Sequence, residues 1–163
     1  MNPTLLAVSG FHAWPITNGY VLRVARLLEA LLEWWEIVLI SPPPPEPSEW
    51  PARDGLCEWR HVQTERQGVL LASDAEGWGR LGRAAASAVR EFRPAACLLW
   101  AGPDALLLDD FHLSPSLVDR IDAATLHEWR RLRTTRGLQE RLSVMRSTVA
   151  WGRLERRIVR RAA

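Results

Sequence analysis

Hydrophobic and polar residues follow two different periods in the first part of the chain. An unbroken apolar run at residues 5–8 has the composition of a strand that is buried on both faces of a sheet. Over residues 21–31 the apolar positions recur at steps of three and four, which predicts an amphipathic helix, and a second apolar run follows at residues 37–40. These patterns predict two parallel strands joined through the helix by a right-handed crossover.

The same alternation continues along the chain. It predicts further strands at residues 57–62, 95–100 and 115–119, and a helix over residues 78–92 that stops before Pro94. The order of the segments therefore predicts an α/β fold: one Rossmann-like open parallel sheet, with the first strand central and helices on both faces. A chain of 163 residues is expected to form a single domain.

Two more helices are predicted near the C-terminus, one beginning at Asp122 and one near Gly137. The second carries a stripe of apolar residues that recur at helical spacing, namely Leu138, Leu142, Met145 and Val149. We expect this stripe to be exposed, which favours a homodimer through the C-terminal helix.

The distribution of charge is uneven along the chain, with an excess of Arg at its C-terminal end. Residues 1–128 hold 10 Arg and 17 acidic residues, whereas residues 129–163 hold 11 Arg and two acidic residues, and the chain has no Lys. This asymmetry predicts an anionic partner for the C-terminal segment: a membrane surface, nucleic acid, phosphates or an acidic protein domain. A solvated helix face explains it equally well.

Several enzyme classes lack their signatures in the sequence. The residues after the first strand match neither the dinucleotide-binding glycine pattern nor the P-loop, and G-x-S-x-G is absent. Cys57 and Cys97 lack metal-ligand spacing and are predicted to be buried free thiols. The pair Asp109 and Asp110 alone does not specify a metal, so no metal or cofactor is predicted.

No segment reaches the roughly 20 apolar residues of a membrane-spanning helix. The first four residues also lack the basic start of a signal peptide. A cytoplasmic location is therefore expected.

Candidate binding residues gather in the loop after the first strand, at the edge where open α/β sheets bind ligands. Asn18 can cap the helix and Gly19 lets a ligand approach the backbone, so that helix amides face a phosphate, although capping alone explains both residues. His12 can contact a sugar hydroxyl or transfer a proton, or it has no function. Trp14 can stack on a sugar or belong to the core, and Asp122 can bind hydroxyls or cap a helix.

The order of motifs resembles a known enzyme family. The first strand is followed by P-x-x-N-G-Y-V-L-R-V, W-E-I-V-L-I-S, R-P-A-A-C-L-L-W, S-L-V-D-R-I-D-A and a basic W-x-R-L-E-R-R helix. This order is similar to the N-terminal half of GT-B glycosyltransferases. More narrowly, it resembles the retaining group 1, or family 4-like, enzymes that transfer sugars from nucleotide-sugar donors.

The resemblance implies roles for particular residues. Gly19, with Asn18 beside it, matches the glycine that approaches acceptor or donor phosphates, and the family's D-x-x-D corresponds to Asp119 and Asp122. The chain departs from the family where a histidine precedes the second aspartate, because Ile121 stands there. The histidine at the end of the fourth predicted strand and the paired glutamates of the donor-binding C-terminal domain are also missing, so the catalytic residues are unknown.

The implied function is therefore that of the acceptor-binding half of a glycosyltransferase, inactive without its donor-binding domain. The acceptor is expected to be lipid-linked or a polysaccharide, and the missing domain would bind the nucleotide-sugar donor. The Arg-rich helix would contact the inner face of the membrane peripherally, whereas nucleic acid is not expected as a partner of such an enzyme. An alternative interpretation is a noncatalytic flavodoxin-like module whose Arg-rich C-terminal helix binds a partner or nucleic acid.

Overall fold

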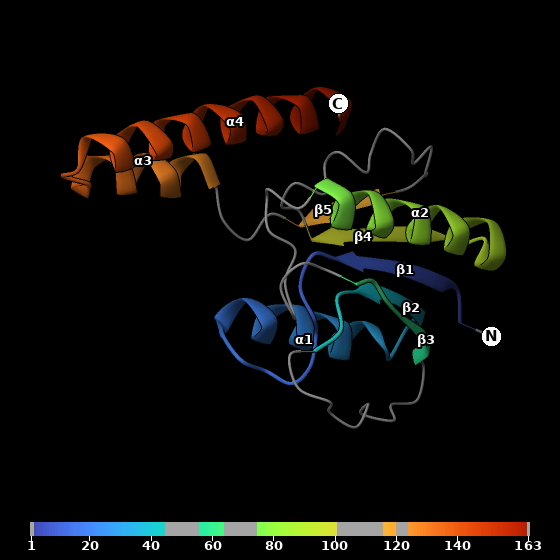
Figure 1. Cartoon of the computed structure of the whole chain (residues 1–163). Helices are drawn as coiled ribbons and strands as arrows, with labels where there is room; N and C mark the ends of the chain where they lie inside the picture. The colour runs from blue at the N-terminus through green and yellow to red at the C-terminus, as the bar shows by residue number, and fades with distance from the viewer. Residues whose placement is uncertain (1, 45–55, 64–74, 101–115, 120–123, 163) are drawn as a thin grey trace. The chain divides into compact units, whose positions relative to one another are not determined.

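The computed structural model of the chain describes residues 2–44, 56–63, 75–100, 116–119 and 124–162 (Figure 1). The chain divides into two compact units, Met1–Asp119 and Arg120–Ala163, which we call unit 1 and unit 2. The sequence predicts that residues 1–163 form a single domain. That prediction depends on how the two units are joined, and it stays a prediction.

Unit 1 is built on a parallel sheet. Its strands are β1 (Thr4–Ser9), β2 (Glu36–Ser41), β3 (Leu56–His61), β4 (Ala96–Trp100) and β5 (Ser116–Asp119). Their order is β3-β2-β1-β4-β5, and every neighbouring pair is parallel. The predicted α/β fold with a central first strand is thereby confirmed.

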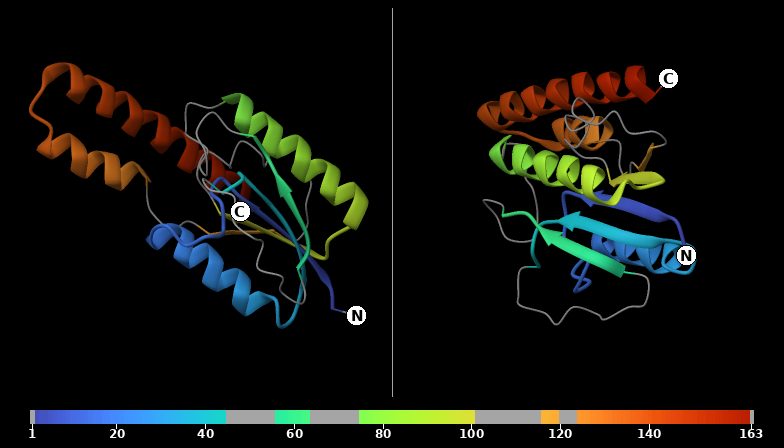
Figure 2. Two further views of the ribbon diagram at one scale, coloured as in Figure 1. Left: turned by 60° about the horizontal axis from the view of Figure 1, so that its bottom comes forward. Right: turned by 90° about the vertical axis from the view of Figure 1, so that its right-hand side faces the viewer.

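Two helices cover the sheet, one on each face. They are α1 (Gly19–Leu31) and α2 (Ala75–Phe92), and Figure 2 shows them on opposite sides of the strands. A strand between two helical layers must be apolar on both faces, which explains why β1, β2 and β4 are continuous apolar runs instead of alternating ones. The helices that the spacing of apolar residues predicts are both present.

The core between the sheet and α2 forms one cluster of buried side chains. The strands contribute every second residue, because successive side chains of a strand point to opposite faces. The cluster comprises Leu6, Val8, Val38, Ile40, Val62, Cys97 and Leu99 from the sheet side and Trp78, Leu81, Ala85 and Ala88 from α2. The residues of α1 that are buried are Val21, Val24, Ala25 and Leu28.

The C-terminal end of α2 is fixed by local backbone geometry. Arg93 adopts a left-handed conformation with φ of 46°, and its amide donates a hydrogen bond to the Val89 carbonyl oxygen at 3.0 Å. This is a common way to end a helix, and Pro94 cannot continue it. The chain therefore leaves α2 and enters β4 within a few residues.

An ion cluster connects β3 to the last turn of α2. The guanidinium of Arg60 contacts the carboxylates of Glu58 and Glu91, and it lies 5.1 Å from the centre of the Phe92 ring. Hydrogen bonds to the two carboxylates raise the pKa of Arg60 above its ordinary value. The edge strand β3 is thus held to the helix that follows it.

The prediction of buried thiols is confirmed for Cys97. This residue is a free cysteine in the core, and its burial raises the pKa of the thiol to about 11. It therefore stays protonated and poorly nucleophilic at neutral pH. Cys57 lies in β3, and its side chain is outside the described residues.

Unit 2 is a helical hairpin. Its helices, α3 (Ala124–Thr134) and α4 (Leu138–Ala162), are those that the sequence predicts, and they contact each other along the hairpin. The amide of Arg141 donates to the Gly137 carbonyl oxygen at 2.8 Å, so that α4 begins directly after the turn. Within the described ranges, no helix of either unit is long and apolar enough to cross a membrane.

The core of unit 1 allows a first prediction. Leu81 is fully buried between α2 and the sheet, so Leu81→Ala removes apolar contacts and leaves a cavity. We expect it to lower the free energy of unfolding by about 2 to 5 kcal/mol, measured by urea denaturation. Arg83→Ala, at an exposed position of the same helix, should cost less than about 0.5 kcal/mol. Equal losses in the two variants would contradict the burial of Leu81 against the sheet.

Candidate functional site

The strand order creates a recognisable edge in unit 1. From β1 the chain builds outward through β2 to β3, and it then returns to place β4 on the other side of β1. The order therefore reverses between β1 and β4. In open α/β sheets, ligands bind at the carboxyl ends of the strands beside such a switch point. The loop of residues 10–18 leaves β1 at this edge and leads into α1.

Asn18 is the N-cap of α1. Its backbone is extended, and its side-chain oxygen Oδ1 accepts hydrogen bonds from the amides of Tyr20 at 2.9 Å and Val21 at 3.0 Å. Its carbonyl oxygen accepts a third bond from the amide of Leu22 at 2.9 Å. Capping by Asn18 is therefore confirmed, and a phosphate could use the Tyr20 and Val21 amides only by displacing the Asn18 side chain. Phosphate binding here stays a prediction.

The backbone at Gly19 is open. A Cβ atom added to this residue would meet no heavy atom within 4 Å, and the residue is exposed at the first turn of α1. A ligand can thus approach the main chain at the start of the helix without steric hindrance. This openness is what the predicted role of Gly19 requires.

His12 lies inside the loop and not on its surface. It is 5% exposed, and its Nε2 atom is 3.3 Å from the hydroxyl oxygen of Thr17. Thr17 also accepts a hydrogen bond from the side-chain amide of Asn18 at 3.5 Å. His12 therefore supports the loop beside the helix cap, and its predicted contact with a sugar hydroxyl, which stays a prediction, would need the loop to open.

Trp14 belongs to an aromatic cluster in the core. It is 7% exposed, and its ring meets the Trp59 ring edge-on, with 5.9 Å between centroids. Trp59 in turn meets His61 edge-on at 4.7 Å, and its Nε1 atom donates a hydrogen bond to the Ser41 hydroxyl at 2.7 Å. The core interpretation of Trp14 is confirmed, while stacking on a sugar ring stays a prediction.

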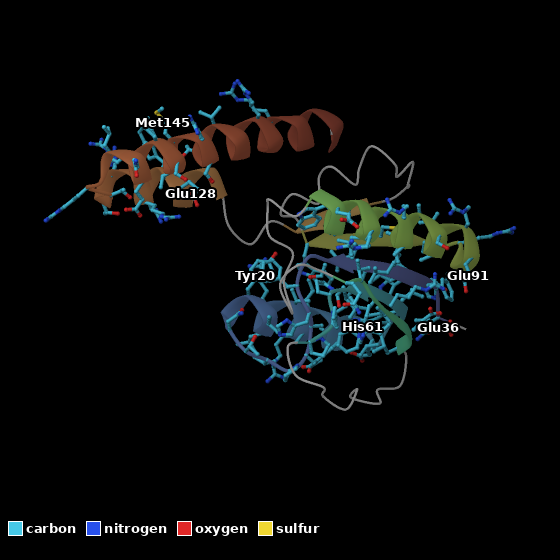
Figure 3. All side chains as sticks on the ribbon, viewed as in Figure 1. Tyr20, Glu36, His61, Glu91, Glu128 and Met145 are labelled. Atoms are coloured by element: carbon cyan, nitrogen blue, oxygen red, sulfur yellow. The ribbon has the colours of Figure 1, made fainter. Side chains whose placement is uncertain are left out.

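His61 is the chemically versatile member of this cluster. It lies at the carboxyl end of β3, opposite Ser41 of β2, and it remains exposed (Figure 3). Desolvation lowers the pKa of its imidazole below the ordinary value, so the neutral form, which can both donate and accept a hydrogen bond, is favoured at neutral pH. His61 is not among the predicted site residues, although its place two residues after Trp59 in a predicted strand puts both side chains on one face.

A buried hydrogen-bond donor lies at the end of β4. Trp100 is fully buried and pairs with Ser9 of β1, and its Nε1 atom has no hydrogen-bond partner within the described ranges. Buried donors without partners are rare and costly in native proteins. The carboxyl edge therefore holds a second polar group, besides His61, that the sequence does not predict for the site.

The acidic candidates have side chains outside the described residues. Asp122 and the pair Asp109 and Asp110 lie outside the described residues. Asp119 ends β5, but its side chain is also outside them. Within the part of the chain that the structure describes, no group of three or more His, Cys, Asp or Glu side chains could hold a metal ion.

An apolar cavity of about 250 Å³ lies at the other end of the strands. Its lining includes Leu5 and Ala96, near the starts of β1 and β4, together with Leu31, Trp35, Cys97, Leu98 and Leu117. Ligand sites usually combine an apolar wall with a few converging polar side chains, and this lining has no charged residue. We therefore place the candidate site at the carboxyl edge and not in this cavity.

Comparisons of the chain with protein-family models, with curated proteins and with solved structures found no match.

The helix cap gives the second prediction. Asn18→Ala leaves the Tyr20 and Val21 amides without their acceptor, and we expect it to lower the free energy of unfolding by about 1 kcal/mol in urea denaturation. Asn18→Asp is the matched control, because its carboxylate accepts the same two bonds and should retain most of the stability. An Asn18→Ala variant as stable as the wild type would contradict the capping geometry.

Proposed function

We propose that unit 1 binds the acceptor of a glycosyltransferase that uses a nucleotide-sugar donor. The acceptor would bind at the carboxyl edge of the sheet, beside the open backbone of Gly19. The observation that carries the proposal is the coincidence of the switch point between β1 and β4 with an accessible helix start in the loop that follows β1. The motif order of the chain supports it independently.

The polar groups at this edge suit a hydroxyl-rich ligand. Thr17 and Asn18 are exposed beside Gly19, and a hydroxyl or an amide can bind a sugar hydroxyl as donor or acceptor. Trp14, in the same loop, is buried and packs its ring against that of Trp59. Unit 1 would hold and orient the acceptor, which lowers the entropic cost of the transfer step.

In this proposal the donor is bound by a second domain. Its phosphates need positive charge or amides to stabilise the leaving group, and closure of the two domains would exclude water from the reactive sugar. The Asn18 cap already occupies the amides of Tyr20 and Val21. Assigning the acceptor to unit 1 and the donor elsewhere is consistent with that occupancy.

The alternative of a flavodoxin-like module requires a different strand order. Flavodoxin-like sheets have the order 2-1-3-4-5, whereas the described strands have the order 3-2-1-4-5. The order of the described strands therefore supports a Rossmann-like sheet over a flavodoxin-like one. Partner binding through the Arg-rich C-terminal segment does not depend on this strand order and stays a prediction.

The third prediction tests the binding site. Gly19→Trp fills the open space at the start of α1 with an indole, and we expect it to weaken acceptor binding by about tenfold or more. Binding would be followed by NMR titration with a panel of oligosaccharides and of lipid-linked sugars. Ala30→Trp is the matched control, because Ala30 is exposed near the other end of the same helix. Equal affinities in the two variants would exclude the edge beside Gly19 from the site.

The fourth prediction tests whether the acceptor and the nucleotide-sugar donor bind to different domains. The 163-residue chain alone should bind an acceptor but should not transfer sugar, because the proposal gives the donor site to another domain. Incubation with a panel of nucleotide sugars and the acceptor identified by titration, followed by mass spectrometry, measures this. Sugar transfer by the chain alone would disprove the assignment, and absence of any acceptor binding would disprove the proposed function itself.

A further inference from the structure

The apolar stripe of α4 is exposed. Leu138 is 76% exposed, and Leu142, Met145 and Val149 each keep nearly half of their surface in contact with solvent. Figure 3 shows Met145 on the side of α4 that points away from α3. The four residues are spaced 4-3-4, so they form one straight seam of roughly 17 Å along the helix. We call these four residues the α4 seam.

Few of the described side chains of unit 2 are buried. Val144, at 2% exposure, is the one buried apolar residue among the unit 2 side chains that the structure describes. Most of the stability of a helix in a protein comes from packing of its apolar face, and the α4 seam contributes no buried residue to such packing. The α4 seam is therefore an apolar surface that another element can cover.

Two of the four side chains that flank the seam carry positive charge. Arg141 and Arg146 lie at the positions directly beside it, and both are exposed. Neither forms an ion pair within the described ranges, whereas Arg131 contacts Glu128 and Glu140. The other two flanking residues, Gln139 and Thr148, are uncharged. In paired helices the flanking residues select the partner by charge.

We propose that the α4 seam binds an amphipathic helix of a partner protein that carries Asp or Glu on both sides of its own apolar stripe. The apolar residues of the partner would cover Leu142 and Met145, and its carboxylates would pair with Arg141 and Arg146. Unit 2 would bind this helix whether or not unit 1 binds a glycan acceptor. The proposal thus stands apart from the proposed enzymatic function.

A second copy of the chain suits the seam less well. In a parallel pair, Arg141 of one copy would lie opposite Arg146 of the other, which is repulsive. In an antiparallel pair each of these arginines would face an uncharged Thr148 or Gln139, and the excess of Arg in residues 129–163 would still repel its copy. An acidic helix instead pairs both arginines.

An anionic membrane also fits less well. A helix that lies in a membrane interface buries a broad apolar face, whereas the α4 seam is one residue wide and has polar or charged neighbours on both sides. Arg beside the seam can reach carboxylates on a helix that packs on it. The narrow stripe with charged flanks favours a helical partner over a lipid surface.

The experiment uses two synthetic helical peptides of three heptads each. Both have Leu at the two apolar positions of every heptad, and the positions beside them are all Glu in one peptide and all Lys in the other. Like charges keep each peptide from pairing with itself. Binding to the full chain is measured by fluorescence anisotropy at low and at physiological salt. We expect the Glu peptide to bind roughly tenfold or more tightly than the Lys peptide, and high salt to reduce the difference.

Three variants make the test specific. Met145→Asp places a charge in the seam and should abolish binding, with circular dichroism checking that the helices persist. Arg141→Glu combined with Arg146→Glu alters no buried side chain and should reverse the preference toward the Lys peptide. Arg130→Glu combined with Arg133→Glu is the matched control on α3, and it should retain the preference for the Glu peptide.

Other outcomes would overturn the proposal. Equal binding of the two peptides would exclude charge selection by Arg141 and Arg146. A dimer in light scattering that Met145→Asp dissociates would make the α4 seam a contact between copies. Sedimentation with vesicles of phosphatidylcholine and phosphatidylglycerol that depends on Met145, without peptide binding, would make it a membrane surface.

Discussion

The burial of β1 on both faces is the constraint on which unit 1 depends. Every residue from Leu5 to Ser9 is almost completely inaccessible to solvent, and the strand is hydrogen-bonded to β2 on one side and β4 on the other. A parallel neighbour can be reached only through a crossover, so each connection must carry the chain over a face of the sheet. The helices α1 and α2 are therefore required to cover the two faces that β1 exposes.

The position of the candidate site follows from that constraint. Because all strands are parallel, their carboxyl ends meet at one edge, and the chain must leave β1 there before it enters α1. The polar groups of the loop have to be satisfied locally at this edge. Asn18 caps the helix and Thr17 contacts His12, which leaves Gly19 as open backbone. The same geometry that buries β1 therefore exposes the start of α1.

The sequence predicts the elements of unit 1 well because their signals are local. Apolar runs mark strands buried on both faces, and the cap at Asn18 follows from a residue type at a helix start. The contacts of Trp14 with Trp59 could not be predicted, because they join a loop and a strand that are distant in sequence. Burial of His12 likewise depends on how the loop closes. For the same reason the sequence predicts the edge of the sheet at which a ligand would bind, but not which side chains would face it.

Periodicity alone also does not reveal what covers a helix. The buried stripe of α2 and the exposed stripe of α4 have the same alternation of three- and four-residue steps. In α2 that stripe packs on the sheet, and small residues such as Ala85 and Ala88 allow the helix to approach closely. In α4 the stripe has no small residue, stays exposed and is flanked by Arg141 and Arg146, and in the interaction proposed for unit 2 a partner helix would supply both apolar area and negative charge. The two stripes therefore differ in the residues within and beside them and not in their spacing, and it is those residues that the proposal for α4 uses.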